Sequence, residues 1–244
     1  MPEHEIAKHG KEIYRAWTAH EVNWKHRLLD ILIEVLIIVF AITLSLLVER
    51  WREGMHDRKV EKQFLLGLKK DLQNDLRQLA GDSLSYVLMR DGWSYFRTKA
   101  VNHLPLNNDS VIKYSPSLMN TTDFIPNDSR FEALKSSGQL GVLEDDSLQN
   151  LILDLYQNKI RSMLVQTGFI TQFHNQQMLP YLSDNAFLKE DGSSNIDEVI
   201  RAPKMQNYLL IGFSAIGALQ RYHDVMEQSR EIIAMIDIQY GIKD

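Results

Sequence analysis

Residues 31–48 read ILIEVLIIVFAITLSLLV, and this stretch decides how the rest of the chain is interpreted. Fifteen of its 18 residues are hydrophobic, the exceptions being Glu34, Thr43 and Ser45. A bilayer core about 30 Å thick needs roughly 20 apolar helical residues, and residues 28–48 supply 21 with Asp30 included. No polar face develops over the 14 residues after Glu34, as it would on a surface helix. The stretch therefore predicts a single transmembrane helix.

The flanks of this run support the same interpretation. Trp24 and Trp51 are 27 positions apart, which at 1.5 Å per residue is roughly 40 Å, the thickness of a bilayer with its interfaces. The predicted membrane-interface anchors are Trp24, Trp51, Arg27 and Arg50. The run is too long for the apolar region of a signal peptide and is followed by charged residues, so it is not a cleaved signal. An unusually apolar core helix of a soluble protein is the alternative.

Composition excludes several classes of protein. The chain has 244 residues, 44% of them hydrophobic and 24% charged, with a formal net charge of -5. These averages exclude a disordered chain, a collagen-like repeat and a polytopic membrane protein. The mild acidity argues against a nucleic-acid binder. Because there is no cysteine, the chain has no disulfide, zinc-thiolate site, iron–sulfur cluster or thiol nucleophile.

Five regions follow along the chain. They are an N-terminal segment (1–27), the transmembrane helix (28–48), a long stalk helix (49–102), a Pro/Asn/Ser-rich loop (103–128) and a helical bundle domain (129–244). The N-terminal segment is expected to be an amphipathic interfacial helix or, alternatively, a frayed tail. The stalk shows an apolar stripe at helical steps of three or four, formed by Val60, Phe64, Leu68, Leu72, Leu76 and Leu79. The predicted fold is all-α, with further helices packed back on the stalk as a bundle.

Capping and breaking residues place the helices of the bundle domain. A short helix from Asp128 or Ser129 should end at Gly138, and a second should begin at a cap formed by residues 145–147 and end before Pro180. Pro203 suits the first turn of the last helix.

Two acids give the membrane segment its most distinctive feature. Asp30 and Glu34 are one turn apart, and at about 100° per residue Ala41, Ser45 and Val48 fall on the same side. Small residues four apart allow two helices to approach closely, and polar groups on that face can bond across the contact. The candidates for helix packing or ion binding are Asp30, Glu34, Ala41 and Ser45.

Glu34 has two interpretations. As a structural residue it lies near the interface and pairs with Lys25 or Arg27, or contacts a second helix. As a functional residue it forms a carboxylate ring in an oligomer that binds cations or relays protons.

Sequence motifs for catalysis are missing. The chain has no dinucleotide or phosphate loop, no nucleophile elbow and no zinc-protease motif. Its eight histidines show no metal-ligand spacing, and no aromatic residues interleave with a basic patch. We therefore expect no catalytic, metal or cofactor site, no nucleic-acid partner and no small-molecule substrate.

Two stretches carry a resemblance to a known family. An acid opens the span (Glu34), a Trp-polar-Glu signature closes it (residues 51–53), a Leu-x-x-Leu-x-x-Asp-Leu pattern follows (residues 65–72), and FEALKSSG occupies residues 131–138. The chain thereby resembles an uncharacterised bacterial family of small single-pass inner-membrane proteins with a helical extramembrane domain. That family usually has Asn where this chain has Arg52.

The orientation of the span in the membrane is not decided by its flanking charges. The two flanks each carry five Lys or Arg residues, so the positive-inside rule does not orient the helix. The resemblance implies a cytoplasmic N-terminus and a periplasmic C-terminal domain in the bacterial inner membrane.

From the span and its polar face, we expect a membrane-anchored interaction or scaffold protein whose partners are the lipid bilayer and either a second copy (a homo-oligomer) or another membrane protein. The alternative is a channel-forming or ion-coupled homo-oligomer that uses Glu34.

Overall fold

The structure is a computed structural model that describes residues 24–190 and 193–242. It is all-α in this part of the chain, where the one β-type contact is an isolated bridge between Leu188 and Ser194. The chain divides into two compact units, Met1–Arg58 and Lys59–Asp244. The helix α2 (Trp24–Val101) contributes residues to both units. The prediction of an all-α fold is confirmed, and the predicted segment 1–27 lies outside the described residues except for the start of α2.

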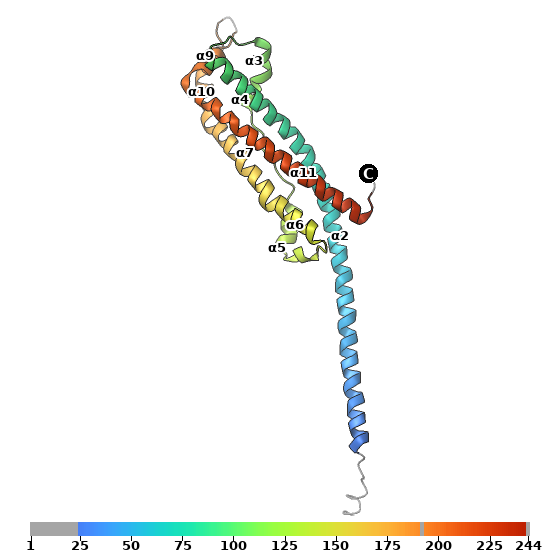
Figure 1. The fold of residues 1–244 in the computed structure, drawn as a ribbon. Helices are drawn as coiled ribbons and strands as arrows, with labels where there is room; N and C mark the ends of the chain where they lie inside the picture. The colour runs from blue at the N-terminus through green and yellow to red at the C-terminus, as the bar shows by residue number, and fades with distance from the viewer. Residues whose placement is uncertain (1–23, 191–192, 243–244) are drawn as a thin grey trace, which may run out of the picture. The chain divides into compact units, whose positions relative to one another are not determined.

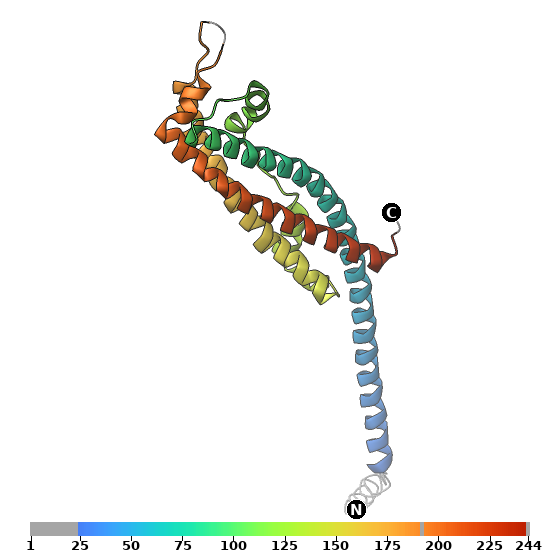
Figure 2. The same ribbon diagram turned by 45° about the horizontal axis from the view of Figure 1, so that its top comes forward.

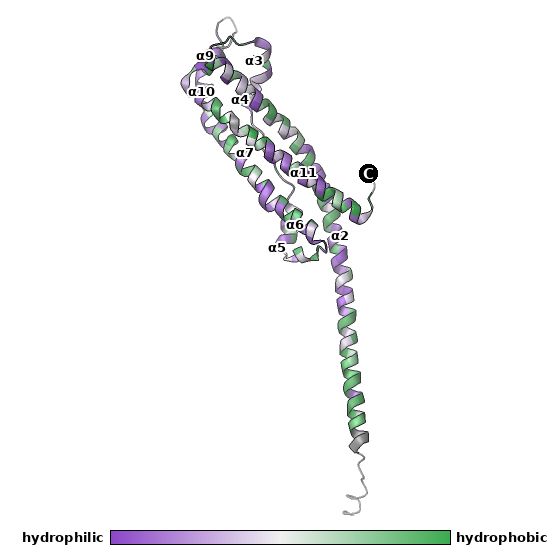
Figure 3. Cartoon of the chain, in the orientation of Figure 1, coloured by the Kyte–Doolittle hydropathy of each residue, from purple (hydrophilic) through white to green (hydrophobic). Residues whose placement is uncertain are grey.

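The first unit consists, where it is described, of the N-terminal part of α2. Figure 3 shows an almost uniformly hydrophobic stretch followed by a hydrophilic one. The helix contains an 18-residue window of mean hydropathy 3.0, none of which is buried. A core helix of a soluble protein would be buried, and this helix is long and apolar enough to span a membrane.

Three long helical rods form the second unit. They are the C-terminal part of α2, the continuous rod α6–α8 (residues 146–185), and α11 (Ser214–Tyr240), and they lie side by side in Figures 1 and 2. The first two rods run in the same direction and α11 returns antiparallel to them (Figure 1). The second unit begins at Lys59, so most of the stretch predicted to be a stalk is a helix of the bundle.

The buried face of α2 follows a strict repeat with alternating steps of three and four residues. Its members are Leu65, Leu68, Leu72, Asp75, Leu79, Asp82, Tyr86, Met89, Trp93, Phe96 and Ala100. An average step of 3.5 residues keeps one seam of a helix against its neighbours. All six residues of the predicted stripe lie in α2, and two of them, Val60 and Leu76, are half-buried.

The second rod is one unbroken run of helix from α6 (Asp146–Asp154) through α7 (Arg161–Phe173) to α8 (Leu179–Asn185). The predicted cap is confirmed, since the Asp145 side chain accepts hydrogen bonds from the backbone N–H groups of Ser147 and Leu148. Two π-helical segments interrupt the α-helical pattern, η2 (Leu155–Ile160) and η3 (His174–Met178).

The predicted helix end before Pro180 is wrong, because the rod continues to the end of α8. Pro180 is the second residue of α8, separated from the end of η3 by Leu179 alone. A π turn is wider than an α turn and changes which backbone groups pair next to the proline, which has no N–H to donate. The helix therefore continues past Pro180 without a break.

The connection between α2 and the second rod is more ordered than predicted. The stretch 103–128, predicted as a loop, contains the short helices α3 (Asn108–Tyr114) and α4 (Pro116–Met119). An extended segment then leads to α5 (Ser129–Ser136). The predicted helix end at Gly138 is confirmed, and its φ of 72° is a left-handed conformation that glycine adopts without strain. A 3-10 turn, η1 (Gln139–Val142), follows.

The last helices meet α2 at a glycine. After α9 (Ile196–Arg201), α10 (Pro203–Leu210) begins at the predicted proline, and the 3-10 turn η4 (Ile211–Phe213) joins it to α11. A Cβ at Gly212 would lie 2.8 Å from Cε3 of Trp93. Only glycine therefore lets η4 approach the Trp93 ring this closely.

Candidate membrane-helix face

The apolar part of α2 in the first unit is uncovered. Its large hydrophobic side chains between Leu28 and Val48 are 47–66% exposed. A contiguous apolar surface of this length is not stable in water, so lipid or a partner helix must cover it.

Glu34, Ala41 and Ser45 all lie on this exposed surface. Ser45 Oγ donates a hydrogen bond to the Ala41 carbonyl at 2.9 Å, and Thr43 Oγ1 donates to the Val39 carbonyl at 2.7 Å. These bonds satisfy both hydroxyl protons within the helix, which lowers the cost of placing them in hydrocarbon. The small profile at Ala41 and Ser45 remains available for close helix contact.

Three of the predicted site residues, Trp24, Arg27 and Asp30, belong to α2, but their side chains lie outside the described ones. The predicted pairing of Glu34 with Lys25 or Arg27 therefore stays a prediction. The anchors Arg50 and Trp51 are exposed, Trp51 to 68%. Side chains of this kind match the headgroup level of a bilayer.

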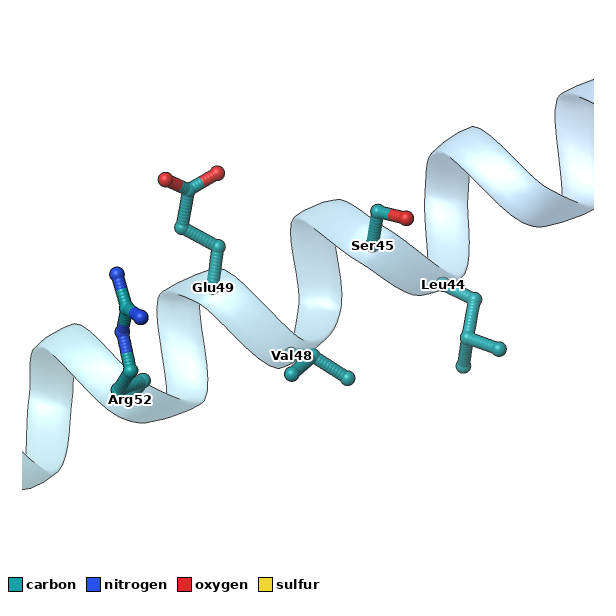
Figure 4. Close-up of a pocket in the computed structure, with 5 residues that line it drawn as sticks. All are labelled: Leu44, Ser45, Val48, Glu49 and Arg52. Atoms are coloured by element: carbon teal, nitrogen blue, oxygen red, sulfur yellow. The ribbon is translucent and has the colours of Figure 1, made fainter.

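A shallow hollow extends the candidate face toward the end of the apolar segment. It is lined by Leu44, Ser45, Val48, Glu49 and Arg52. In Figure 4, Glu49 and Arg52 extend on the same side of the helix, whereas Leu44 and Val48 point to another side. Sequence reasoning did not select Glu49 or Arg52, although steps of four and seven from Ser45 place them on its side of the helix.

The residues after this hollow form a polar belt of mixed charge. Arg52, Glu53, His56 and Asp57 line a second hollow within the first unit. Alternating acids and bases on one helix can pair with the same belt on another copy, because opposite charges then face each other across the contact.

The second unit carries three acids on the buried face of α2, which sequence reasoning also missed. Glu61 is 4% exposed, Asp75 1% and Asp82 8%. A buried carboxylate needs hydrogen-bond partners, and each of these has one in the connecting segments, while Glu61 Oε1 also accepts from Gln239 Nε2 of α11 at 3.4 Å. Glu61 Oε1 accepts from the Glu144 backbone N–H at 3.1 Å, and Asp82 Oδ1 accepts from the Thr122 hydroxyl.

Asp75 has the most complete set of partners of the three. Its Oδ1 accepts from the Asn127 backbone N–H at 3.1 Å and from Asn127 Nδ2 at 2.6 Å. Burial raises the pKa of Asp75 above its ordinary value, and the bonds from Asn127 oppose this shift. These acids fasten the connecting segments to α2, and the geometry indicates a structural role for them.

A buried histidine in the bundle has both ring nitrogens within hydrogen-bond distance of a neighbour. His174 is 1% exposed, with Nε2 2.9 Å from the Leu118 carbonyl oxygen and Nδ1 3.0 Å from Asn175 Oδ1. Among residues 24–190 and 193–242, no group of three or more His, Asp or Glu side chains is placed to hold a metal ion.

No family model, curated protein or solved structure matches the chain.

Proposed function

We propose that the protein is a single-pass membrane-anchored scaffold that self-associates through one face of α2. The main support is the uncovered apolar segment, which carries an acid, Glu34, and two small residues, Ala41 and Ser45, on one side. Lipid suits the Ile, Leu and Val side chains of the opposite face, but it gives no partner to a carboxylate. A second copy supplies both a close-packing surface and polar groups at the same depth.

The proposed location is the bacterial inner membrane, with the N-terminus in the cytoplasm and the bundle unit in the periplasm. The support is the family resemblance of residues 28–76 and 131–157. External protease on spheroplasts should then degrade the bundle. Loss of only the N-terminal tail would reverse the orientation.

The mass of the full chain in mild detergent tests self-association. We expect a multiple of the 28.3 kDa chain mass, and a substitution of Ala41 by Leu should shift the population toward monomer because it fills the close-packing surface. Copurification of a different membrane protein in fixed ratio, with no self-association, would instead support an accessory subunit. A monomer with no copurifying protein would contradict both.

An ion-coupled oligomer is the alternative function. The observation that favours it is Glu34, a carboxylate on the exposed surface of the apolar segment. Ion flux into vesicles that contain the purified chain separates the two proposals. A scaffold gives no flux above empty vesicles, whereas a channel gives flux that Glu34→Gln abolishes.

A further inference from the structure

The bundle unit contains a small cavity with an excess of positive charge. It has a volume of about 210 Å³ and is lined by Asn158, Lys159, Ser162, Arg221 and Asp224. These residues come from η2, from the start of α7 and from α11. The volume is below the roughly 300–1,000 Å³ of sites that enclose drug-sized ligands, so a small ion is the fitting occupant.

Arg221 is fixed in place but has hydrogen-bonding capacity left over. Its Nη1 donates to Ser162 Oγ at 2.5 Å. Its Nε is enclosed and has no hydrogen-bond partner in the described part of the chain. A guanidinium carries five N–H donors in a rigid fork that matches the oxygens of an oxyanion. Because Nε is closed off from solvent, the remaining Nη hydrogens of Arg221 are the donors that can reach an ion in the cavity.

Lys159 adds a second cation to the lining of the cavity. It is half-buried, and its ammonium makes no hydrogen bond or ion pair with a described group. The hydrogen bond from Asn158 is the main cause of the lowered pKa of Asp154, and the charge of Lys159 makes a minor contribution. Two cations therefore face a cavity in which Asp224 is the single lining carboxylate.

The backbone at this place is unusual as well. Asn158 and Lys159 belong to the π-helical segment η2. Single π turns inside α-helices are costly in hydrogen-bond geometry and recur at functional sites. Here the wider turn carries two of the five lining residues.

Asp224 determines which oxyanion suits the cavity. Its Oδ1 already accepts from Gln220 Nε2 at 2.8 Å, which leaves further acceptor capacity on the carboxylate. A carboxylate repels a fully deprotonated oxyanion such as sulfate, but it accepts a hydrogen bond from the P–OH group of hydrogen phosphate. A cavity that combines two cations with one carboxylate thus favours a protonated tetrahedral oxyanion.

We propose that this cavity is a binding site for inorganic hydrogen phosphate. Lys159 and Arg221 neutralise the charged oxygens, Ser162 holds the Arg221 guanidinium, and the Asp224 carboxylate accepts a hydrogen bond from the P–OH group.

Titration calorimetry on the full chain in nanodiscs of uncharged lipid, at constant ionic strength, tests the site. The probes are phosphate, sulfate and glycerol 3-phosphate. We expect saturable phosphate binding, and sulfate binding at least about tenfold weaker because it lacks the hydroxyl donor. Glycerol 3-phosphate tests a phosphate ester such as a lipid headgroup. At pH above its second pKa, about 6, the ester has no P–OH group and should also bind weakly.

Variants then assign the residues. Lys159→Gln and Arg221→Gln should each weaken phosphate binding by about tenfold or more, as expected for loss of a charge-assisted bond. Asp224→Asn should reduce the preference for phosphate over sulfate to less than about threefold. The matched control is Lys113→Gln, which removes a lysine that lines a different hollow. Circular dichroism verifies that each variant is folded.

Three results would overturn the proposal. They are no saturable phosphate binding, equal binding of phosphate and sulfate by the unaltered chain, and the same weakening in Lys113→Gln as in Lys159→Gln. Because Lys159 makes no bond that holds the bundle together, its variant remains informative if Arg221→Gln fails to fold. Ester binding as strong as that of phosphate would contradict the role of Asp224.

Discussion

Two buried tyrosines show, at the scale of single residues, how much one hydroxyl group matters in this core. The rings of Tyr86 and Tyr222 lie 5.3 Å apart between centroids, and both residues are fully buried. Tyr86 donates its hydroxyl to the Thr122 carbonyl at 3.3 Å, whereas the Tyr222 hydroxyl has no partner among the described residues. Burial raises the pKa of both phenols, so both stay neutral at physiological pH.

The two tyrosine-to-phenylalanine substitutions should therefore differ in sign. Tyr86→Phe leaves the Thr122 carbonyl without its donor and should lower the free energy of unfolding by about 0.5–1.5 kcal/mol. Tyr222→Phe removes an unpaired buried hydroxyl and should leave stability unchanged or raise it by about 1 kcal/mol. Denaturant unfolding of the full chain in detergent, followed by tryptophan fluorescence, measures both. A larger loss for Tyr222→Phe than for Tyr86→Phe would contradict this assignment.

Asp75 gives the stability of the bundle a specific pH dependence. Its pKa is raised in the folded state, so the folded chain holds this proton more tightly than the unfolded chain does. Its stabilising contribution is complete below the unfolded value of 3.8 and is lost as pH rises through the folded value. Asp75→Asn removes this loss, and its Oδ1 can still accept from Asn127.

The variant should accordingly gain stability relative to the unaltered chain as pH rises from 3.8 toward neutrality. Unfolding measurements on both proteins across this range give the difference directly. A difference that is constant or falls with pH would show that burial does not control this carboxyl.

At the scale of elements, local patterns predicted the helices and their caps better than they predicted the seam. The cap at Asp145 and the helix end at Gly138 could be predicted because each depends on neighbouring residues. The buried seam of α2 could not, because it includes Asp75 and Asp82. A search for apolar residues passes over both, and their partners in the connecting segment are more than 35 residues away.

Proline and glycine show the same limit. Pro180 was predicted to end a helix, but the π-helical segment η3 before it lets the rod continue. The need for glycine at position 212 depends on the Trp93 ring of another helix, and no local pattern reveals that contact.

Gly212→Ala should therefore destabilise the bundle. The Trp93 ring is 1% exposed and its Nε1 donates to the Ser117 carbonyl at 2.8 Å, so it cannot move away from an added Cβ. Overpacking of this kind costs about 1–3 kcal/mol. The matched control is Gly217→Ala in α11, where the nearest atom to an added Cβ is 4.0 Å away. That substitution should stabilise the helix by up to about 1 kcal/mol. Equal effects at both positions in denaturant unfolding would contradict the close packing of η4 on Trp93.

At the scale of the whole molecule, the two units of the chain are suited to different surroundings. Residues 28–48 are suited to lipid, and the bundle unit buries its own core of large side chains, with Trp93, Tyr86 and Phe131 among the most enclosed. The candidate face could be predicted from the spacing of Glu34, Ala41 and Ser45, and the same helical spacing extended beyond Ser45 would also have indicated Glu49 and Arg52. The cavity of Lys159 and Arg221 joins residues that are more than 60 positions apart in the sequence, so no local motif could reveal it.

Disulfide crosslinking in native membranes tests the central claim, self-association through this face of α2, most directly. The chain has no cysteine, so each single-cysteine variant reports on one position without background. Ser45→Cys lies on the proposed face, and Leu46→Cys lies at the same depth but about 100° around the helix. A disulfide needs Cβ atoms about 3.5–4.5 Å apart. We expect a covalent dimer under mild oxidation for Ser45→Cys and none for Leu46→Cys. No dimer at Ser45, or equal dimer at both positions, would contradict it.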